Sequence, residues 1–337
     1  MLPLVSIIVA CFNGARYIPG LAESLIPVVA ESRGGCEVIF VDDGSTDSSA
    51  ELARQHLLGV RVIQQPNRGG SAARNAGVLM ARGEYLQLLD VDDTIEPEKL
   101  EVQAGTASSV RADVVYSDWR LVTVDDGRVV RTEIFAPAEA PCEMIEALLD
   151  GWWAPPVSYL FRRSAYLELG GCDETIKVWW DPDLYLRLAL AGRAHVYAPG
   201  VLSTYYRYLD VKSLARRDLQ ANARERELIL RKTVAALNEK DMLTSRRRKA
   251  AAKACFGVLR TAGIADPTWL EDMTRFIFEL DPAFRPTGPA PYRALACALG
   301  LATAERLAVA IRAFRRPRAG DRRQEMEDRR PSQNLKN

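Results

Sequence analysis

Short apolar runs alternate with helix-like segments through the first hundred residues, and this order constrains the fold more than any other feature. The runs predict buried strands at Val5–Ala10, Val38–Val41, Val60–Ile63 and Tyr85–Leu89. Apolar periodicity predicts helices between them, near residues 15–30, 48–57, 71–81 and 96–110. Strands and helices in this order form a mostly parallel central sheet with helices on both faces. The sequence therefore predicts an α/β fold whose ligands bind at the carboxyl ends of the strands.

The pattern changes after residue 112. The turn Asp125-Asp126-Gly127 lies between β-rich runs and predicts a hairpin over residues 113–135. A helix is predicted to start near Asp181, with short strands around it at Val157–Phe161, His195–Tyr197 and Leu202–Tyr206. From about Ser213 the pattern is helical. We predict an α/β domain over residues 1–212 with halves 1–112 and 113–212, a helical region over 213–311 and a basic, disordered tail over 312–337.

Charge and composition exclude several classes of protein. The 337 residues include 45 basic and 44 acidic ones, so no overall positive field favours a nucleic-acid partner. The six cysteines show no paired spacing, and the first residues lack the pattern of an export signal, which predicts a cytoplasmic location. The apolar stretch 294–304 is too short to span a bilayer, which needs roughly 20 apolar residues.

Polar clusters follow three of the predicted strands. Asn13-Gly14 follows the first strand, Asp42 to Asp47 the second, and Asp90-Val91-Asp92-Asp93 the fourth. Carboxylates at a strand's end suit a divalent cation that carries phosphates, although an acidic turn has the same pattern. Capping of the next helix by Asp47, or by Ser48 with Glu51, explains the end of the second cluster. It does not explain the adjacent Asp42 and Asp43, which repel each other unless they are solvated or matched to a ligand.

A glycine-rich segment carries two arginines just before a predicted helix. Arg68 and Arg74 flank Gly69-Gly70, and such helix starts can bind anions. The segment matches neither the dinucleotide-binding nor the Walker pattern, so both of those fingerprints are excluded. Arg74 can contact a phosphate or pair with an acid in the sheet, and the sequence leaves both roles open.

Taken together and in this order, the motifs resemble the family 2 inverting glycosyltransferases with the GT-A fold. The motifs that carry the resemblance are Val5–Asn13, Val41–Asp47, Gly70–Asn75, Asp90–Asp93, Ser158–Arg163, Gly170–Asp173 and Trp179–Leu188. They cover roughly residues 3–210, and the helical remainder is not covered. The resemblance implies a Rossmann-like sheet with a nucleotide-sugar-binding half, 1–112, and an acceptor-binding half, 113–212.

The resemblance also implies roles for particular residues. Asp90 and Asp92 match the family's metal-binding Asp-x-Asp motif for Mn²⁺ or Mg²⁺, with Asp92 as the more direct ligand. Asp181 matches the catalytic base. Nucleotide-sugar contacts are implied for Ala10, Phe12, Asn13, Asp42, Asp43, Arg74, Asp90 and Val91.

Two departures from the family pattern stand out. Trp180 occupies the position before the base, where relatives usually have Glu, so Trp179 and Trp180 either line an acceptor site or pack in the core. Leu209-Asp210 occupies the stretch where many relatives place a metal-binding His, which leaves Asp210 as a weak substitute. The two histidines, His56 and His195, fall in a helix pattern and a strand pattern and are predicted to be structural.

The sequence thus predicts a metal-dependent inverting glycosyltransferase. We expect it to transfer one sugar from a nucleoside-diphosphate donor, with UDP favoured, to a hydroxyl of a glycan, a lipid-linked glycan or a protein. The basic residues 246–249 and those after Arg312 allow a peripheral contact with the cytoplasmic face of a membrane, although solvated charge runs look the same. A non-catalytic sugar-nucleotide-binding protein remains an alternative. A nucleotidyltransferase is disfavoured because the N-terminus has no glycine-rich, lysine-containing loop.

Overall fold

The computed structural model describes residues 4–136, 143–211, 218–264 and 266–314. Its central sheet has the strand order β3-β2-β1-β4-β8-β6-β9-β5, and β7 pairs with β6 at the side. The first four strands in this order run parallel to one another, as predicted. Beyond them the sheet is mixed. The predicted boundary at residue 212 and the tail from residue 315 onward lie outside the described residues.

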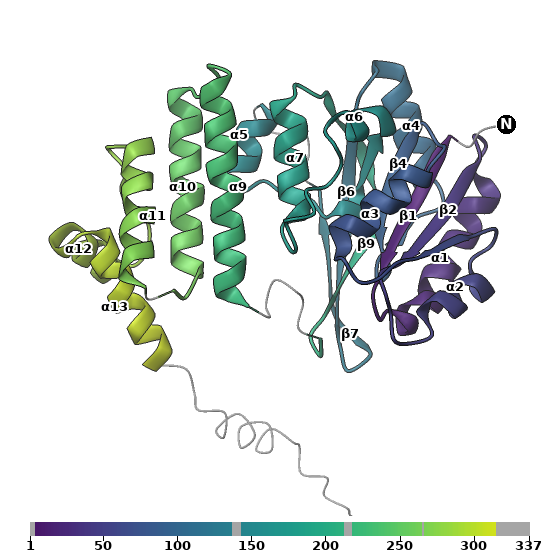
Figure 1. Ribbon diagram of the computed structural model, residues 1–337, viewed down its shortest axis with the longest axis horizontal. Coiled ribbons are helices and arrows are strands. Elements are labelled where there is room, and N and C mark those ends of the chain that lie inside the picture. Colours follow the sequence, from purple (N-terminus) through teal and green to yellow (C-terminus); the bar gives the residue numbers. More distant parts are fainter. Residues whose placement is uncertain (1–3, 137–142, 212–217, 265, 315–337) are drawn as a thin grey trace, which may run out of the picture.

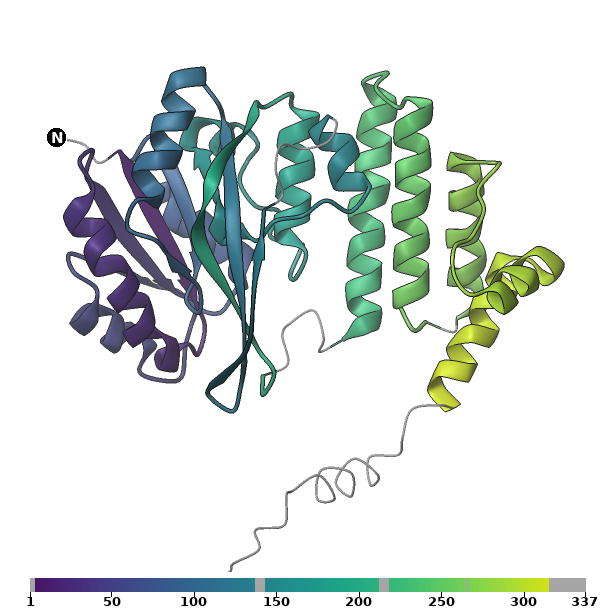
Figure 2. The same cartoon turned by 180° about the vertical axis from the view of Figure 1, so that it is seen from behind.

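The four parallel strands lie mostly inside the molecule, which explains their apolar runs, although the edge strand β3 is only partly buried. They are β1 (Val5–Cys11), β2 (Cys36–Asp42), β3 (Arg61–Gln64) and β4 (Tyr85–Asp90). Successive side chains of a strand point to opposite faces. Ile8 therefore packs in the cluster that contains α3 (Gly70–Met80), while Ile7 and Val9 pack in the cluster that contains α1 (Ile18–Glu31). Figures 1 and 2 show these helices on opposite faces of the sheet.

The other helices around the parallel strands also follow the sequence pattern. A short 3-10 helix, Ala15–Tyr17, precedes α1, while α2 (Ser49–His56) and α4 (Lys99–Val110) lie close to the predicted ranges. Gly44 has a φ of +78°, and a Cβ there would lie 2.8 Å from the backbone nitrogen of Asn67. The turn after β2 therefore needs glycine at this position.

The second half of the sheet adds a hairpin and one long strand. The hairpin joins β6 (Val114–Asp125) to β7 (Arg128–Phe135), as predicted, and β8 (Tyr159–Arg162) connects β6 to β4. The strands predicted at 195–197 and 202–206 form one strand, β9 (His195–Tyr208), which follows β6 through register shifts near Asp118. Asp118 accepts a hydrogen bond from the backbone of Gly200, and this bond holds the irregular part of β9 in the sheet. The two-residue strand β5 (Thr94–Ile95) was not predicted.

Helices of the C-terminal third continue the core of the sheet domain. Two short helices, α5 (Met144–Leu149) and α6 (Arg163–Glu168), precede α7 (Trp180–Leu190). The remaining helices are α9 (Leu219–Glu239), α10 (Ser245–Thr261), α11 (Pro267–Leu280), α12 (Ala290–Leu299) and α13 (Leu301–Phe314). One hydrophobic cluster runs from Ile8 in the sheet through Leu184 of α7 to Leu237 and Ile277 in these helices. Figure 1 shows them side by side, extending away from the sheet.

Within the described ranges, none of the helices has the length and apolar character needed to cross a membrane.

Candidate functional site

The loops that follow β1 and β2 are held together by reciprocal hydrogen bonds. The Asn13 side-chain oxygen accepts from the Thr46 backbone N–H at 2.8 Å, and the Asn13 backbone N–H donates to the Ser45 hydroxyl at 2.9 Å. Asn13 has a φ of 52°, a left-handed conformation that asparagine tolerates better than most residues. Beside it Ala10 is half-buried, while the Phe12 ring is 52% exposed and free to contact a ligand.

Protein donors already surround Asp42 and Asp43, both of which are buried. Asp42 accepts from the Ser45 N–H and from the Gln64 amide at 3.1 and 3.2 Å. Asp43 accepts from the Gln65 amide at 2.7 Å and from two backbone N–H groups, those of Arg68 and Gly69, at 2.9 and 2.8 Å.

These bonds answer the question that the sequence left open. The adjacent carboxylates do not need a ligand to offset their repulsion, because backbone and amide dipoles do so. The predicted Ser48–Glu51 capping box is wrong, since the Ser48 side chain makes no capping bond. Asp47 accepts from the Ser49 N–H at 3.0 Å instead, and its other oxygen accepts from the Ala15 N–H at 3.1 Å.

Arg74 connects the acidic strand end to the helix that carries Asp181. Its side chain is buried, and it makes an ion pair with the carboxylate of Asp90. The guanidinium lies 3.7 Å from the centre of the Trp180 ring, a stacked cation–π geometry. The structural role that the sequence allowed for Arg74 is therefore realised, and through it Asp90 and Trp180 are brought together.

The three carboxylates after β4 have different surroundings. Burial and the neighbouring charge of Asp90 raise the pKa of Asp92 to about 7, while Arg16 and Arg74 oppose the shift. Asp93 is buried and accepts from the Tyr206 backbone N–H at 3.0 Å, which ties it to β9. Asp92 thus has little compensation from protein donors, whereas Asp93 has a structural partner.

Asp90 and Asp92, the other two carboxylates of this cluster, fit a metal ion whose remaining ligands are substrate phosphates and water. No group of three or more Asp, Glu, His or Cys side chains in the described ranges could hold a metal ion. Mg²⁺ is commonly bound through one or two carboxylates together with substrate phosphates and water. Asp90 and Asp92 supply carboxylate oxygens of the kind that such an ion takes.

Asp210, which the sequence offered as a substitute for the absent His, has a different partner. It pairs with Arg16 at 3.5 Å on an exposed part of the molecule. Arg16 also lies over the ring of Tyr17, at 4.5 Å, and over that of Tyr208, at 5.5 Å. The short helix after β1 thus places Arg16 and Tyr17 close to Asp92, and the end of β9 places Tyr208 there.

Asp181 is buried in the first turn of α7. One of its oxygens, Oδ2, accepts a hydrogen bond from Nε1 of Trp153 at 2.8 Å. Burial raises the pKa of Asp181 to about 7, and the Trp153 bond limits the rise. A carboxylate with this pKa can take a proton near neutral pH.

Tyr205 of β9 lies between the acidic strand end and Asp181. Burial raises its pKa above the ordinary value for tyrosine, and the charges of Asp93, Asp90, Asp92 and Asp181 raise it further. Neither Tyr205 nor Trp153 was among the site residues predicted from the sequence. The only sequence signal was that Trp153 belongs to a second Trp-Trp pair, at 152–153, and that Tyr205 belongs to a tyrosine-rich strand.

Comparison with known proteins identifies the family. The family model described as Glycosyl transferase family 2 matches residues 6–177, just over half of the 337 residues. The chain belongs to glycosyl transferase family 2. Similar family members include Glycosyltransferase GlyG of Streptococcus pneumoniae serotype 4, which is 34% identical over 131 residues, and the Chondroitin synthase of Escherichia coli, 29% identical over 197 residues. These matches span 38% and 56% of this chain but only 42% and 27% of the relatives.

Solved structures support the fold of this family 2 chain. The structure of residues 1–349 of S. aureus TarS, in complex with UDP-GlcNAc, has a TM-score of 0.65 with 20% sequence identity. The likeness covers 94% of this chain and 93% of the TarS chain, so it includes the C-terminal helices. The predicted α/β GT-A fold with a helical C-terminal region is confirmed.

Trp179 and Trp180, the two tryptophans before Asp181 in this family 2 protein, lie mostly inside the structure. The Trp180 ring is 7% exposed and stacks on Arg74. Trp179 is half-buried, and its ring packs against the guanidinium of Arg226 at 4.8 Å. Of the two roles that the sequence left open, core packing describes both residues better than an acceptor surface.

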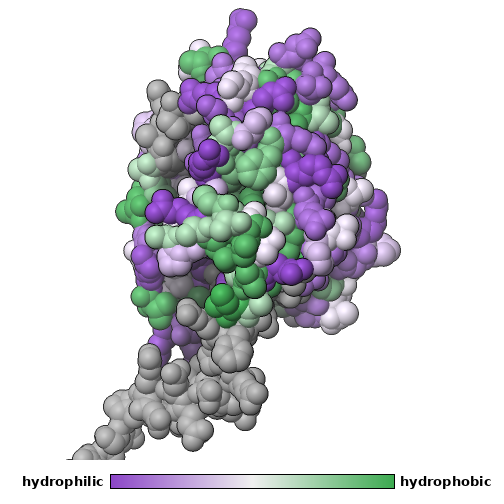
Figure 3. All heavy atoms as spheres, turned by 90° about the vertical axis from the view of Figure 1, so that its left-hand side faces the viewer, coloured by the Kyte–Doolittle hydropathy of each residue, from purple (hydrophilic) through white to green (hydrophobic). Residues whose placement is uncertain are grey.

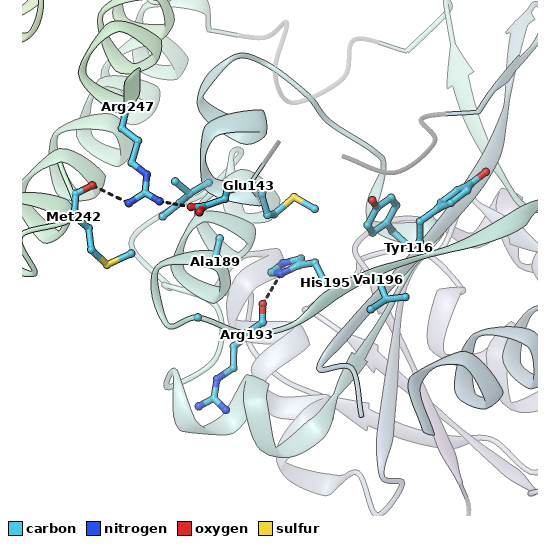
Figure 4. A pocket seen from close by; sticks show the side chains of 12 residues that line it. Tyr116, Glu143, Ala189, Arg193, His195, Val196, Met242 and Arg247 are labelled. Atoms are coloured by element: carbon cyan, nitrogen blue, oxygen red, sulfur yellow. Dashed lines mark hydrogen bonds and ion pairs between the residues drawn. The ribbon is translucent and has the colours of Figure 1, made fainter. Parts of the chain in front are cut away.

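A separate cavity lies away from these residues of the family 2 protein. It has a volume of about 560 Å³ and is lined by residues near the start of β9, the end of α7 and the helices α5 and α10. Figure 4 shows His195 bonded to the Arg193 carbonyl and Arg247 directed at Glu143 and the Met242 carbonyl. Burial lowers the pKa of His195 to about 4, so its ring is neutral. Among the described residues, the cavity's lining includes none of the predicted site residues.

Proposed function

We propose that this family 2 protein transfers one sugar from a nucleoside-diphosphate donor to an acceptor hydroxyl, with inversion of configuration. The observation that carries this proposal is the connection made by Arg74. It pairs with Asp90, beside the expected diphosphate site, and stacks on Trp180, which directly precedes Asp181. A candidate base therefore lies next to the place where the leaving group is expected.

The reaction that we propose is a single displacement. The acceptor oxygen forms a bond to the anomeric carbon while the bond from that carbon to the donor diphosphate breaks. The acceptor's proton passes to the carboxylate of Asp181, and the bonding electrons leave with the diphosphate oxygen. The pKa of about 7 suits Asp181 to this task, because a base works best when its pKa is near the working pH. One displacement inverts the anomeric configuration.

We propose that Asp92 and Asp90 hold Mn²⁺ or Mg²⁺ together with the donor's diphosphate. The support is the raised pKa of Asp92, which reflects negative charge without enough compensation. When bound, such an ion supplies positive charge against the leaving group. Arg16, close to Asp92 and half-exposed, is a second source of positive charge for the phosphates.

For the donor we propose a UDP-sugar. The exposed Phe12 ring can stack on a nucleobase. Ala10 and Asn13 lie at the carboxyl end of β1, as Phe12 does, and Val91 directly follows β4. TarS, the solved relative of the same fold, binds UDP-GlcNAc. Asp42 and Asp43 act in this proposal chiefly by shaping the loops around the base, since their oxygens already accept protein hydrogen bonds. Residues 1–112 would bind the donor and residues 113–212 the acceptor.

We further propose that the enzyme works in the cytoplasm, at the inner face of a membrane, and that α12 and α13 make the contact. Figure 3 shows apolar side chains gathered on this end of the molecule, and exposed ones include Leu299, Leu307 and Ile311. From Pro282 to Arg318 the sequence has one acid, Glu305, and it is buried and paired with Arg260 and Arg312. The same stretch contains Arg285, Arg293, Arg306, Arg312, Arg315, Arg316 and Arg318. An apolar face with basic residues around it suits an anionic lipid surface.

Two cations of the basic run at 246–249 have protein partners. Arg246 pairs with Glu146 at 2.8 Å, and Arg247 is buried and pairs with Glu143. These two ion pairs hold α10 against α5.

A thermal-shift screen tests the donor and the metal at the same time. Nucleoside diphosphates and their sugars are added with Mn²⁺, with Mg²⁺ or with a chelator, and release of nucleoside diphosphate is then measured. A ligand at 100 times its dissociation constant stabilises by about 2.7 kcal/mol, which such a screen detects. We expect stabilisation by a UDP-sugar that needs the cation, followed by release of UDP. Stabilisation without any turnover would favour the non-catalytic binding protein.

A further inference from the structure

Four aromatic rings gather beside Asp181, each from a different part of the chain. Trp119 of β6 and Phe135 of β7 are stacked, with ring centres 4.3 Å apart and an angle of 8° between their planes. Trp153, from the segment after α5, meets Trp119 edge to face at 5.7 Å. Tyr205 of β9 lies 6.1 Å from Trp153 and 6.2 Å from Trp119. The hairpin and β9 thus build one continuous aromatic cluster.

The cluster is buried at its base and exposed at two of its rings. Trp119 is 4% exposed, whereas Trp153 and Phe135 are 38% and 39% exposed. A large aromatic ring buries roughly 150–250 Å² of surface when it is covered. The exposed rings of Trp153 and Phe135 therefore lack part of the stabilisation that burial would give them. The buried Trp119 fixes the positions of the exposed rings. A rigid apolar surface of this kind fits a flat apolar ligand, such as the C–H face of a pyranose ring.

Trp153 also binds the proposed base directly. Its indole N–H donates to Oδ2 of Asp181, and no other side chain in the described ranges hydrogen-bonds to that carboxylate. The bond stabilises the ionised carboxylate and fixes its orientation. A sugar stacked on the exposed face of Trp153 would therefore have its hydroxyls close to the carboxylate that this same residue holds.

We propose that Trp153, Phe135 and Tyr205 form a platform for the acceptor, which is a pyranose ring, and that Trp153 positions Asp181 through its indole N–H. The proposal rests on the proposed transferase function and narrows its acceptor to a carbohydrate. Trp153 has two separable tasks. Its ring binds the acceptor, and its N–H, which is not consumed in the reaction, orients the base.

The adjacent Trp152 supplies a matched control. Its ring packs edge to face on Tyr116 at 4.9 Å, and its indole N–H is buried without a hydrogen-bond partner among the described residues. Trp152→Phe and Trp153→Phe thus remove the same N–H group from neighbouring positions. They differ in that only the second N–H bonds to Asp181.

The experiment uses the full chain with the donor identified by the thermal-shift screen. Acceptor probes are methyl α- and β-pyranosides of glucose, galactose and N-acetylglucosamine, with glycerol as a hydroxyl donor that lacks a ring. For Trp153→Phe we expect kcat to fall about tenfold and the acidic limb of the pH–rate profile to move to higher pH, with acceptor KM nearly unchanged. For Phe135→Ala we expect acceptor KM to rise about five- to tenfold.

Each part of the proposal can be overturned separately. If Trp153→Phe behaves like Trp152→Phe in both kcat and pH profile, Trp153 does not position the base. If the wild type uses glycerol as well as every pyranoside, or Phe135→Ala leaves acceptor KM unchanged, the platform is not an acceptor site. A different result is expected if the proposed transferase function is wrong. The wild type would then release no nucleoside diphosphate, even with water as the acceptor.

Discussion

Two pairs of carboxylates in and around the candidate site have opposite surroundings. Asp42 and Asp43, after β2, accept hydrogen bonds from backbone and amide N–H groups of their own loops. Asp92 and Asp181 have few such donors, and burial raises the pKa of each to about 7. The comparison teaches that acidic residues around one site can have different roles. A carboxylate satisfied by the protein maintains a loop, whereas an unsatisfied one is available to a cation or a proton.

The largest expected effect comes from removing the charge of Asp181. Asp181→Asn should lower kcat by about 10²–10⁴-fold, the usual contribution of a general base, while donor binding is retained. The same variant should unfold at higher denaturant concentration at pH 8, since the folded protein no longer buries this charge. Kinetics and urea unfolding measure the two effects.

Asp183 provides the control for this variant. It lies in the same helical turn, but its carboxylate pairs with Arg187 at 2.8 Å. Asp183→Asn should therefore keep most of the activity. Turnover that persists in Asp181→Asn would reject Asp181 as the base.

The next effect concerns the metal and the donor. Asp92→Ala should weaken cation-dependent donor binding by more than about tenfold, because it removes one of two proposed protein ligands. Calorimetric titration with the donor in Mn²⁺ or in chelator measures this. Equal donor affinity in the wild type with and without chelator would show that Asp92 does not act through a metal.

On the other side of the comparison, Asp43 should matter for stability. Asp43→Ala leaves the backbone N–H groups of Arg68 and Gly69 without their acceptor, which should lower the free energy of unfolding by about 1–2 kcal/mol. Glu51→Ala, on the exposed face of α2, is the control and should change it by less than about 0.5 kcal/mol. Equal stability of the two variants would mean that Asp43 has no structural task.

The smallest effect is a pH dependence. The folded pKa of Asp181, about 7, lies above its ordinary value of 3.8, so the residue gains a proton as the pH falls through 7. The rate should therefore be close to its plateau at pH 8 and about tenfold lower at pH 6. Stability should change in the opposite sense: between pH 4 and 7 the folded state binds this proton more tightly than the unfolded state, so this residue's contribution favours folding at lower pH. A rate that is flat from pH 5 to 8 would contradict the assignment.

Local sequence was sufficient to predict the parallel strands, the hairpin and the protein family. Apolar runs predicted the four parallel strands, because strands covered on both faces, such as β1 and β4, consist mostly of apolar residues. The Asp-Gly turn predicted the hairpin of β6 and β7. The sequence predicted two strands where the structure has the single strand β9, because Pro199-Gly200 interrupts the apolar pattern. Pairing with β6 keeps the strand continuous through this interruption.

By itself, the sequence determined the family, the parallel strands and the acidic cluster that follows β4. The tertiary structure decided which carboxylates are satisfied and which are not. Asp43 takes its donors from residues 65–69, and Asp181 takes its donor from Trp153, 28 positions away along the chain. The protonation of a buried acid depends on such partners and on exclusion from water. Both are fixed by the packing of distant segments, so sequence spacing alone could not reveal them.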